Sequence, residues 1–151
     1  MKFLMPTCAA LQVLGITAVA RQLLTAVNDA RSKNGKQPLC LNAKLATASQ
    51  VQAVDMAAGG FISATGSSGS MPTTRATDLK FNTTGVAEVV GAGYADASVA
   101  IKEWMSSPGY STYLLGDYKY MGAGYAYNSA QVYKSFWVLD FASDAVGETC
   151  A

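Results

Sequence analysis

Few residues in this 151-residue chain are of types that usually carry chemistry. The sequence contains no histidine, although imidazole is the commonest zinc ligand and the usual general base near neutral pH. Mechanisms that depend on histidine are therefore excluded. Serines are abundant, but no histidine is present to activate one, and the lysines form no recognisable Ser-Lys motif. We therefore expect no hydrolytic activity and predict that the chain is not an enzyme.

One carboxylate stands out because of its neighbours. Residues 86–90 alternate in a way that predicts a short strand, with Glu88 on the same face as two valines. A carboxylate among apolar side chains needs a partner or a raised pKa. Glu88 is thus a candidate cleft residue. The alternative interpretation, which needs no further catalytic group, is a structural glutamate bonded to backbone or to a tyrosine such as Tyr110.

The first twenty residues predict a secretory signal peptide. Lys2 precedes an apolar stretch over residues 9–19, and the small residues at 18 and 20 form an A-x-A cleavage site. The alternative is a buried N-terminal helix, and the stretch is too short to span a bilayer. We expect a signal peptide over 1–20, one domain over 21–151, and a secreted, extracellular protein that is not transmembrane.

The cysteines agree with export. Signal cleavage would remove Cys8 and leave Cys40 and Cys150, whose pairing in an oxidising compartment would stabilise the fold by about 4–5 kcal/mol. Two unpaired thiols are the alternative. The Asn-Thr-Thr triplet that begins at Asn82 is a glycosylation acceptor and a weaker marker of export.

Composition limits the classes of partner. Half of the residues are apolar and 14% are charged, which predicts one globular domain with a sizeable core. The formal net charge is +1, so the chain lacks the basic footprint of a nucleic-acid-binding protein. No cofactor is implied by any motif.

Apolar spacing predicts three helices. The first covers residues 21–34, the second follows Asn42 as N-cap to residue 58, and the third follows Asp96 and ends at Pro108. Residues 63–77 are rich in Ser, Thr and Gly, which indicates a loop with one helical turn near 73–79.

The last third predicts an antiparallel hairpin. Gly122, Gly124 and Ala126 share one face of its first strand, so another element must approach that face closely. The return strand over 133–141 carries large apolar groups on both faces. A sheet covered by helices on both sides buries them most simply, so we predict an α+β fold with three layers, an α-β-α sandwich.

Three stretches resemble the CAP superfamily of cysteine-rich secretory, antigen 5 and pathogenesis-related type one proteins, also called SCP-like domains. Residues 23–57 are similar to the opening helix pair of the family, and the segment EWMSSPGY over 103–110 resembles its tryptophan helix. Residues 121–141 resemble its closing glycine-rich hairpin. The resemblance covers residues 23–142 and implies an α-β-α sandwich with a central cleft.

The family cleft usually holds two histidines and acidic partners that suit a divalent metal, and this chain departs from that pattern. The resemblance places Ala64 and Tyr110 where the histidines are expected, and only Glu88 remains of the acidic set. We therefore predict no metal site, with Glu88, Tyr110 and Ala64 as cleft-binding candidates.

The resemblance implies a secreted, non-enzymatic protein that binds a sterol- or fatty-acid-like ligand, or a protein on a host or cell surface. Two alternatives stay open. One is a degenerate, metal-assisted hydrolase-like member that uses Glu88, and the other is a disulfide-stapled structural component of a wall or matrix.

Overall fold

The computed structural model describes residues 16–151, so most of the predicted signal peptide lies outside the described residues. The described chain contains five helices and four strands. In chain order they are α1 (Ala18–Lys33), β1 (Cys40–Leu41), α2 (Ala43–Gly59), α3 (Pro72–Asp78), β2 (Ala87–Ala92), α4 (Ala97–Met105), α5 (Pro108–Leu114), β3 (Tyr120–Tyr127) and β4 (Ser135–Ala142).

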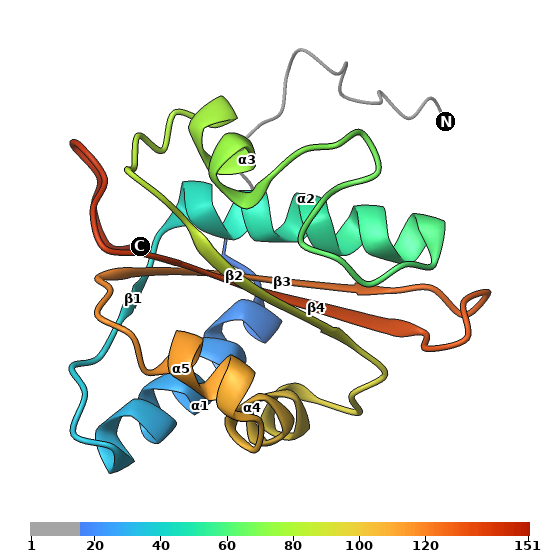
Figure 1. Cartoon of the computed structure of the whole chain (residues 1–151), viewed down its shortest axis with the longest axis horizontal. Coiled ribbons are helices and arrows are strands. Elements are labelled where there is room, and N and C mark those ends of the chain that lie inside the picture. Colours follow the sequence, from blue (N-terminus) through green and yellow to red (C-terminus); the bar gives the residue numbers. More distant parts are fainter. Residues whose placement is uncertain (1–15) are drawn as a thin grey trace.

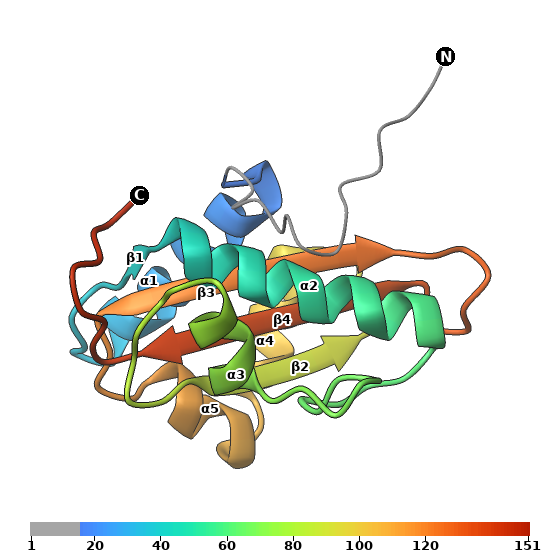
Figure 2. The same ribbon diagram turned by 90° about the horizontal axis from the view of Figure 1, so that it is seen from above.

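The four strands form one sheet in the order β1-β3-β4-β2, so β2 lies at an edge. β1 runs parallel to β3, and the other neighbours are antiparallel. Helices α2 and α3 cover one face of the sheet, while α1, α4 and α5 cover the other (Figure 1 and Figure 2). The predicted α-β-α sandwich is therefore confirmed.

The helix boundaries follow from local capping chemistry. The Asn42 side chain accepts a hydrogen bond from the Leu45 amide at 3.0 Å, and Gly60 ends α2 in the left-handed conformation. Asp96 caps α4 in the same way. Both caps were predicted. α1 begins at Ala18, three residues before the predicted start, so the expected cleavage after residue 20 would remove its first three residues.

Two elements differ from the sequence-based expectation. Pro108 does follow the end of α4, but it also occupies the first turn of a further helix, α5. Proline is favoured there because its missing amide N–H has no intrahelical partner at that position. The short parallel strand β1 was not predicted, since two residues give no alternation to detect.

The glycine face of β3 packs directly against the backbone of α2. A Cβ atom at Gly122 would collide with the carbonyl of Leu45, and one at Gly124 would collide with the carbonyl of Ser49. Backbone cannot move aside as a flexible side chain can. This contact confirms the prediction of a close approach and fixes α2 above the middle of the sheet.

Replacing either glycine should therefore destabilise the fold. We expect Gly124→Ala to lower the free energy of unfolding by about 1–3 kcal/mol, because the added methyl group overpacks a rigid contact. The matched control is Gly85→Ala, whose added methyl group would meet no atom within 4 Å. Chemical denaturation measures both, and equal losses in the two variants would contradict this explanation.

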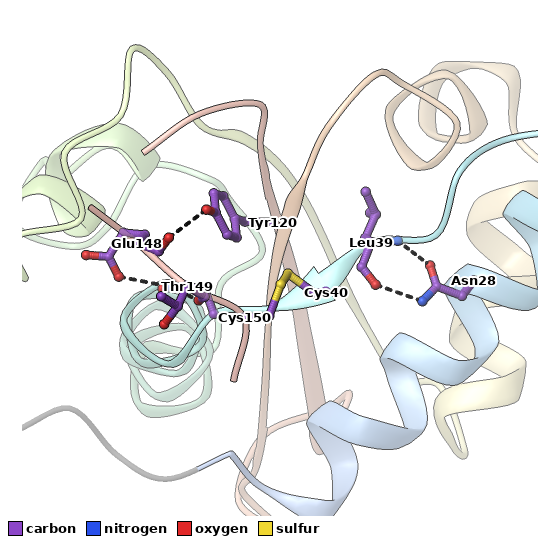
Figure 3. Close-up of a disulfide and its surroundings, with 8 residues drawn as sticks. Asn28, Leu39, Cys40, Tyr120, Glu148, Thr149 and Cys150 are labelled. Atoms are coloured by element: carbon purple, nitrogen blue, oxygen red, sulfur yellow. Dashed lines mark hydrogen bonds between the residues drawn. A yellow bond between two sulfur atoms is a disulfide. The ribbon is translucent and has the colours of Figure 1, made fainter. Parts of the chain in front are cut away.

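The C-terminal segment is joined to β1 by the Cys40–Cys150 disulfide, as predicted (Figure 3). Their Cα atoms lie 5.5 Å apart, and the bridge spans 110 residues of sequence. Around it, the Tyr120 hydroxyl donates to the Glu148 carbonyl at 2.9 Å, and Lys44 pairs with the Glu148 carboxylate at 2.6 Å. The tail is therefore held along the β1 side of the sheet.

Candidate functional site

A cleft of about 550 Å³ lies beside β2 at the edge of the sheet. There β2 runs between α3 on one side and α5 on the other (Figure 1). Its walls are mostly apolar or aromatic. Its lining residues are Ala64, Met71, Pro72, Thr73, Gly85, Val86, Ala87, Glu88, Tyr113, Tyr118, Phe141 and Ser143.

The structure brings two of the three predicted cleft residues together in this site. Ala64 and Glu88 both line the cleft, whereas Tyr110 lies outside the lining with 43% of its surface exposed. The tyrosine that reaches the cleft from α5 is Tyr113, one helical turn further along. Tyr118 joins it and stacks on Phe141 with ring centroids 5.0 Å apart.

Glu88 is paired with an arginine, not with a tyrosine. The Arg75 guanidinium donates from Nη2 to both carboxylate oxygens of Glu88, at 3.0 Å and 3.1 Å. The side chains are only 5% and 1% exposed, respectively. A buried charge requires such a partner, because leaving it unpaired costs several kcal/mol. The carboxylate of Glu88 is therefore neutralised inside the protein.

Arg75 also holds the loop that precedes α3. Its Nη2 donates to the Ala64 carbonyl at 2.7 Å, and its Nη1 donates to the Ser70 carbonyl and hydroxyl, both at 2.9 Å. Sequence analysis did not single out Arg75, which lies in the helical turn predicted near residues 73–79 at the end of a Ser-, Thr- and Gly-rich loop; the structure shows this turn as α3. The need of Glu88 for a partner was predicted, but that partner was expected to be backbone or a tyrosine, not an arginine.

A second buried acid lies directly opposite Glu88. Asp140 pairs with Glu88 in the β2–β4 register, is 1% exposed, and accepts a hydrogen bond from the Ser49 hydroxyl at 2.8 Å. Burial raises the pKa of Asp140 well above its usual value, and the Glu88 carboxylate raises it further. Ser49 and Arg75 oppose these effects. Asp140 therefore favours its neutral form beside the Glu88 carboxylate.

This pKa predicts a pH dependence of stability. A carboxyl whose pKa is raised by folding stabilises the native state below its unfolded pKa, about 3.9, and that stabilisation is lost as the pH rises through the folded pKa. In Asp140→Asn the amide resembles the neutral acid and does not titrate. We therefore expect its free energy of unfolding to decline less than that of the wild type as the pH rises, measured by denaturant titrations from pH 5 to pH 9.

The control for this measurement is Asp144→Asn. Asp144 is exposed, and hydrogen bonds from Thr84 and Thr83 lower its pKa, so its contribution is lost only as the pH falls. This variant should alter the acid limb of the stability profile and leave the alkaline limb unchanged. A wild-type profile that rises towards alkaline pH would contradict a neutral Asp140.

The donor set does not fit a divalent cation. Both oxygens of Glu88 face the Arg75 guanidinium, and Ala64 offers only a backbone carbonyl, which Arg75 already occupies. Within residues 16–151, no three His, Cys, Asp or Glu side chains gather as a metal site. An arginine thus lies beside the acidic residue with which family members would hold a cation.

The glycosylation candidate lies away from this cleft. Asn82 is exposed, as an acceptor must be, and its backbone carbonyl accepts a hydrogen bond from the Val146 amide at 3.1 Å. The hydroxyl of Thr84, the third residue of the triplet, bonds to Asp144 at 3.0 Å. Modification of Asn82 stays a prediction.

The family model of the cysteine-rich secretory proteins, CAP, matches residues 24–141. The chain belongs to the CAP family. The matched range agrees with the resemblance seen over residues 23–142. A search of curated proteins finds no match.

Solved structures share the fold of this CAP domain. An extracellular protein containing an SCP domain from Bacillus anthracis superposes with a TM-score of 0.73 at 21% identity, covering 83% of this chain and 40% of that one. An outer surface protein from Borrelia burgdorferi gives 0.73 at 17% identity, covering 82% and 90%. A cysteine-rich secretory protein from Staphylococcus aureus gives 0.62 at 22% identity, covering 82% and 38%.

These matches concern the fold and the cellular location of the structural neighbours. The chain spans less than half of the Bacillus and Staphylococcus proteins, and the structural neighbours are described as extracellular, surface or secretory proteins. Among residues 16–151, no helix is long and apolar enough to cross a membrane.

Proposed function

We propose that this CAP domain is a secreted, non-enzymatic binding protein whose cleft recognises its ligand by shape and apolar contact. One observation carries the proposal: Glu88, the only charged residue that lines the cleft within the described chain, is bound on both oxygens by Arg75. A carboxylate held in this way is not free to act as a base, a nucleophile or a metal ligand.

The cleft wall provides contact area without free charge. Met71, Tyr113 and Tyr118 supply a thioether and aromatic rings that are at least partly exposed, and burial of apolar surface contributes about 25 cal/mol per Å². Tyr113 is 44% exposed, so it presents both its ring and its hydroxyl to an incoming molecule. A sterol, a fatty-acid chain and an apolar protein surface share this contact chemistry.

Two observations support export, one on the chain itself and one on its structural neighbours. The Cys40–Cys150 disulfide is of a kind that persists in oxidising compartments, and the structural neighbours are described as extracellular or surface proteins. We propose that the chain is secreted and acts in the extracellular space.

The test is a binding titration of the disulfide-intact, secreted protein. Labelled cholesterol and labelled palmitate are titrated separately, and Tyr113→Ala should weaken binding about 5- to 30-fold, since removal of a contact aromatic costs about 1–2 kcal/mol. The matched control is Tyr127→Ala, which removes a tyrosine that is 60% exposed but lies outside the cleft.

A separate titration examines the metal-assisted alternative. Zinc should produce no stoichiometric binding heat with the untagged protein. A stoichiometric zinc complex that disappears in Glu88→Gln, or zinc-dependent hydrolysis in a substrate screen, would contradict the proposed function.

A further inference from the structure

The cleft contains an unpaired strand edge. We propose that the CAP cleft binds an uncharged, extended peptide segment that pairs with the backbone of Glu88 in β2 and of Val86, the residue just before β2. This inference rests on the proposed function and assigns a partner class to the same site: a protein that presents a short extended segment, in preference to a free lipid.

The hydrogen-bond pattern shows which groups of β2 face outward. In an antiparallel pair, the backbone N–H and C=O groups of alternate residues bond to the partner strand, and those of the residues between them point away from it. The Gly93 amide donates to the Ser135 carbonyl at 2.9 Å, so Gly91, Val89 and Ala87 are the residues that bond to β4. The even-numbered residues of β2 therefore direct their backbone groups away from the sheet.

Hydrogen bonds from outside the sheet confirm that the backbone groups of the even-numbered residues face outward. The Trp104 indole donates to the Val90 carbonyl at 3.3 Å, and the Thr73 hydroxyl accepts from the Val86 amide at 3.0 Å. These two contacts occupy the outward-facing backbone at Val86 and at Val90, and they define a short window of strand edge between them. Inside the window lie the Val86 carbonyl and both backbone groups of Glu88. The register directs them away from β4, and no hydrogen bond joins them to a group elsewhere in residues 16–151.

The burial of Glu88 agrees with an open backbone. The residue as a whole is partly exposed, although its side chain is only 1% exposed, so its accessible surface belongs to the main chain. Val86, Ala87 and Glu88 all line the cleft. Unpaired strand groups beside an apolar surface are the feature that strand addition uses, since main-chain bonds supply affinity and flanking side chains supply selectivity.

The two cleft walls suit the alternating side chains of an added strand. Met71 and Thr73 lie on the α3 side, and Tyr113 and Tyr118 lie on the α5 side. Successive side chains of an extended peptide point to opposite faces, so one set would meet each wall. Because Arg75 already neutralises Glu88, the cleft offers no free charge to a charged segment. A lipid tail would leave the Glu88 amide and carbonyl unpaired.

The experiment uses the full disulfide-intact chain and a library of blocked hexapeptides composed of Val, Leu, Thr, Ser and Tyr. Peptides that bind are added to ¹⁵N-labelled protein, and amide hydrogen exchange is followed by NMR. We expect exchange of the Glu88 amide to slow at least tenfold, while the Val89 amide, already bonded to β4, serves as the internal control. Methylation of the backbone nitrogen of the peptide that pairs with Glu88 should abolish binding.

A variant pair checks the location. Met71 is the N-cap residue of α3 and is 49% exposed. Met71→Ser shortens the side chain in the cleft wall, and serine is a residue type that N-cap positions prefer, so α3 should not be destabilised. We expect peptide affinity to fall about tenfold. Val54→Ser, at a position 52% exposed on α2 and outside the cleft, should leave it unchanged.

The outcomes separate the two proposals. Peptide binding with an unchanged Glu88 exchange rate, or binding of cholesterol or palmitate with no peptide bound, would overturn strand pairing and leave the binding function intact. Zinc-dependent activity through Glu88 would overturn the proposed function itself.

Discussion

The buried ion pair between Arg75 and Glu88 is the interaction on which this cleft depends. Two charges removed from water are stable only when they pair well and their remaining hydrogen-bonding groups are satisfied. Arg75 meets part of this requirement through the carbonyls of Ala64 and Ser70, so the same side chain orders the loop before α3. The pair thus ties that loop and α3 to the edge of the sheet, and the cleft is the space left beside them.

The ion pair also determines the chemistry that is left for the cleft. Asp140 lies across from Glu88, and its raised pKa favours a neutral carboxyl. The buried cluster of Arg75, Glu88 and Asp140 therefore contains one cation and one anion, instead of one cation and two anions. In a pattern with two histidines, a cation from solution would balance the acidic residues. Here a tethered guanidinium does so. The cleft therefore has contact surface and an open strand edge with which to bind.

Much of the fold could be predicted because it follows from local rules. Asn42, Gly60 and Asp96 mark helix ends through side-chain caps and a left-handed glycine. The glycine face of β3 could be predicted for a different reason: Gly122 and Gly124 alternate regularly, and a strand face without side chains must receive a neighbour. In contrast, Pro108 was interpreted only as a stop, although the same residue begins α5.

The site was less accessible to sequence analysis than the fold. The alternation of residues 86–90 placed Glu88 correctly on the face with its two valines, but its partner Arg75 lies in a Ser-, Thr- and Gly-rich segment without periodicity. A pairing across 13 residues and two elements has no signature in one sequence. The open backbone of Glu88 was equally hidden, because edge position depends on the order of strands in the sheet.

The most direct test of the central claim is a double-mutant cycle on the ion pair, measured by chemical denaturation at pH 7. Arg75→Met should lower the free energy of unfolding by about 3–5 kcal/mol, because it leaves the Glu88 carboxylate buried and unpaired. Adding Glu88→Gln should recover part of that loss, since the uncompensated charge is then removed. Additive losses in the double variant, or a negligible effect of Arg75→Met alone, would contradict the account.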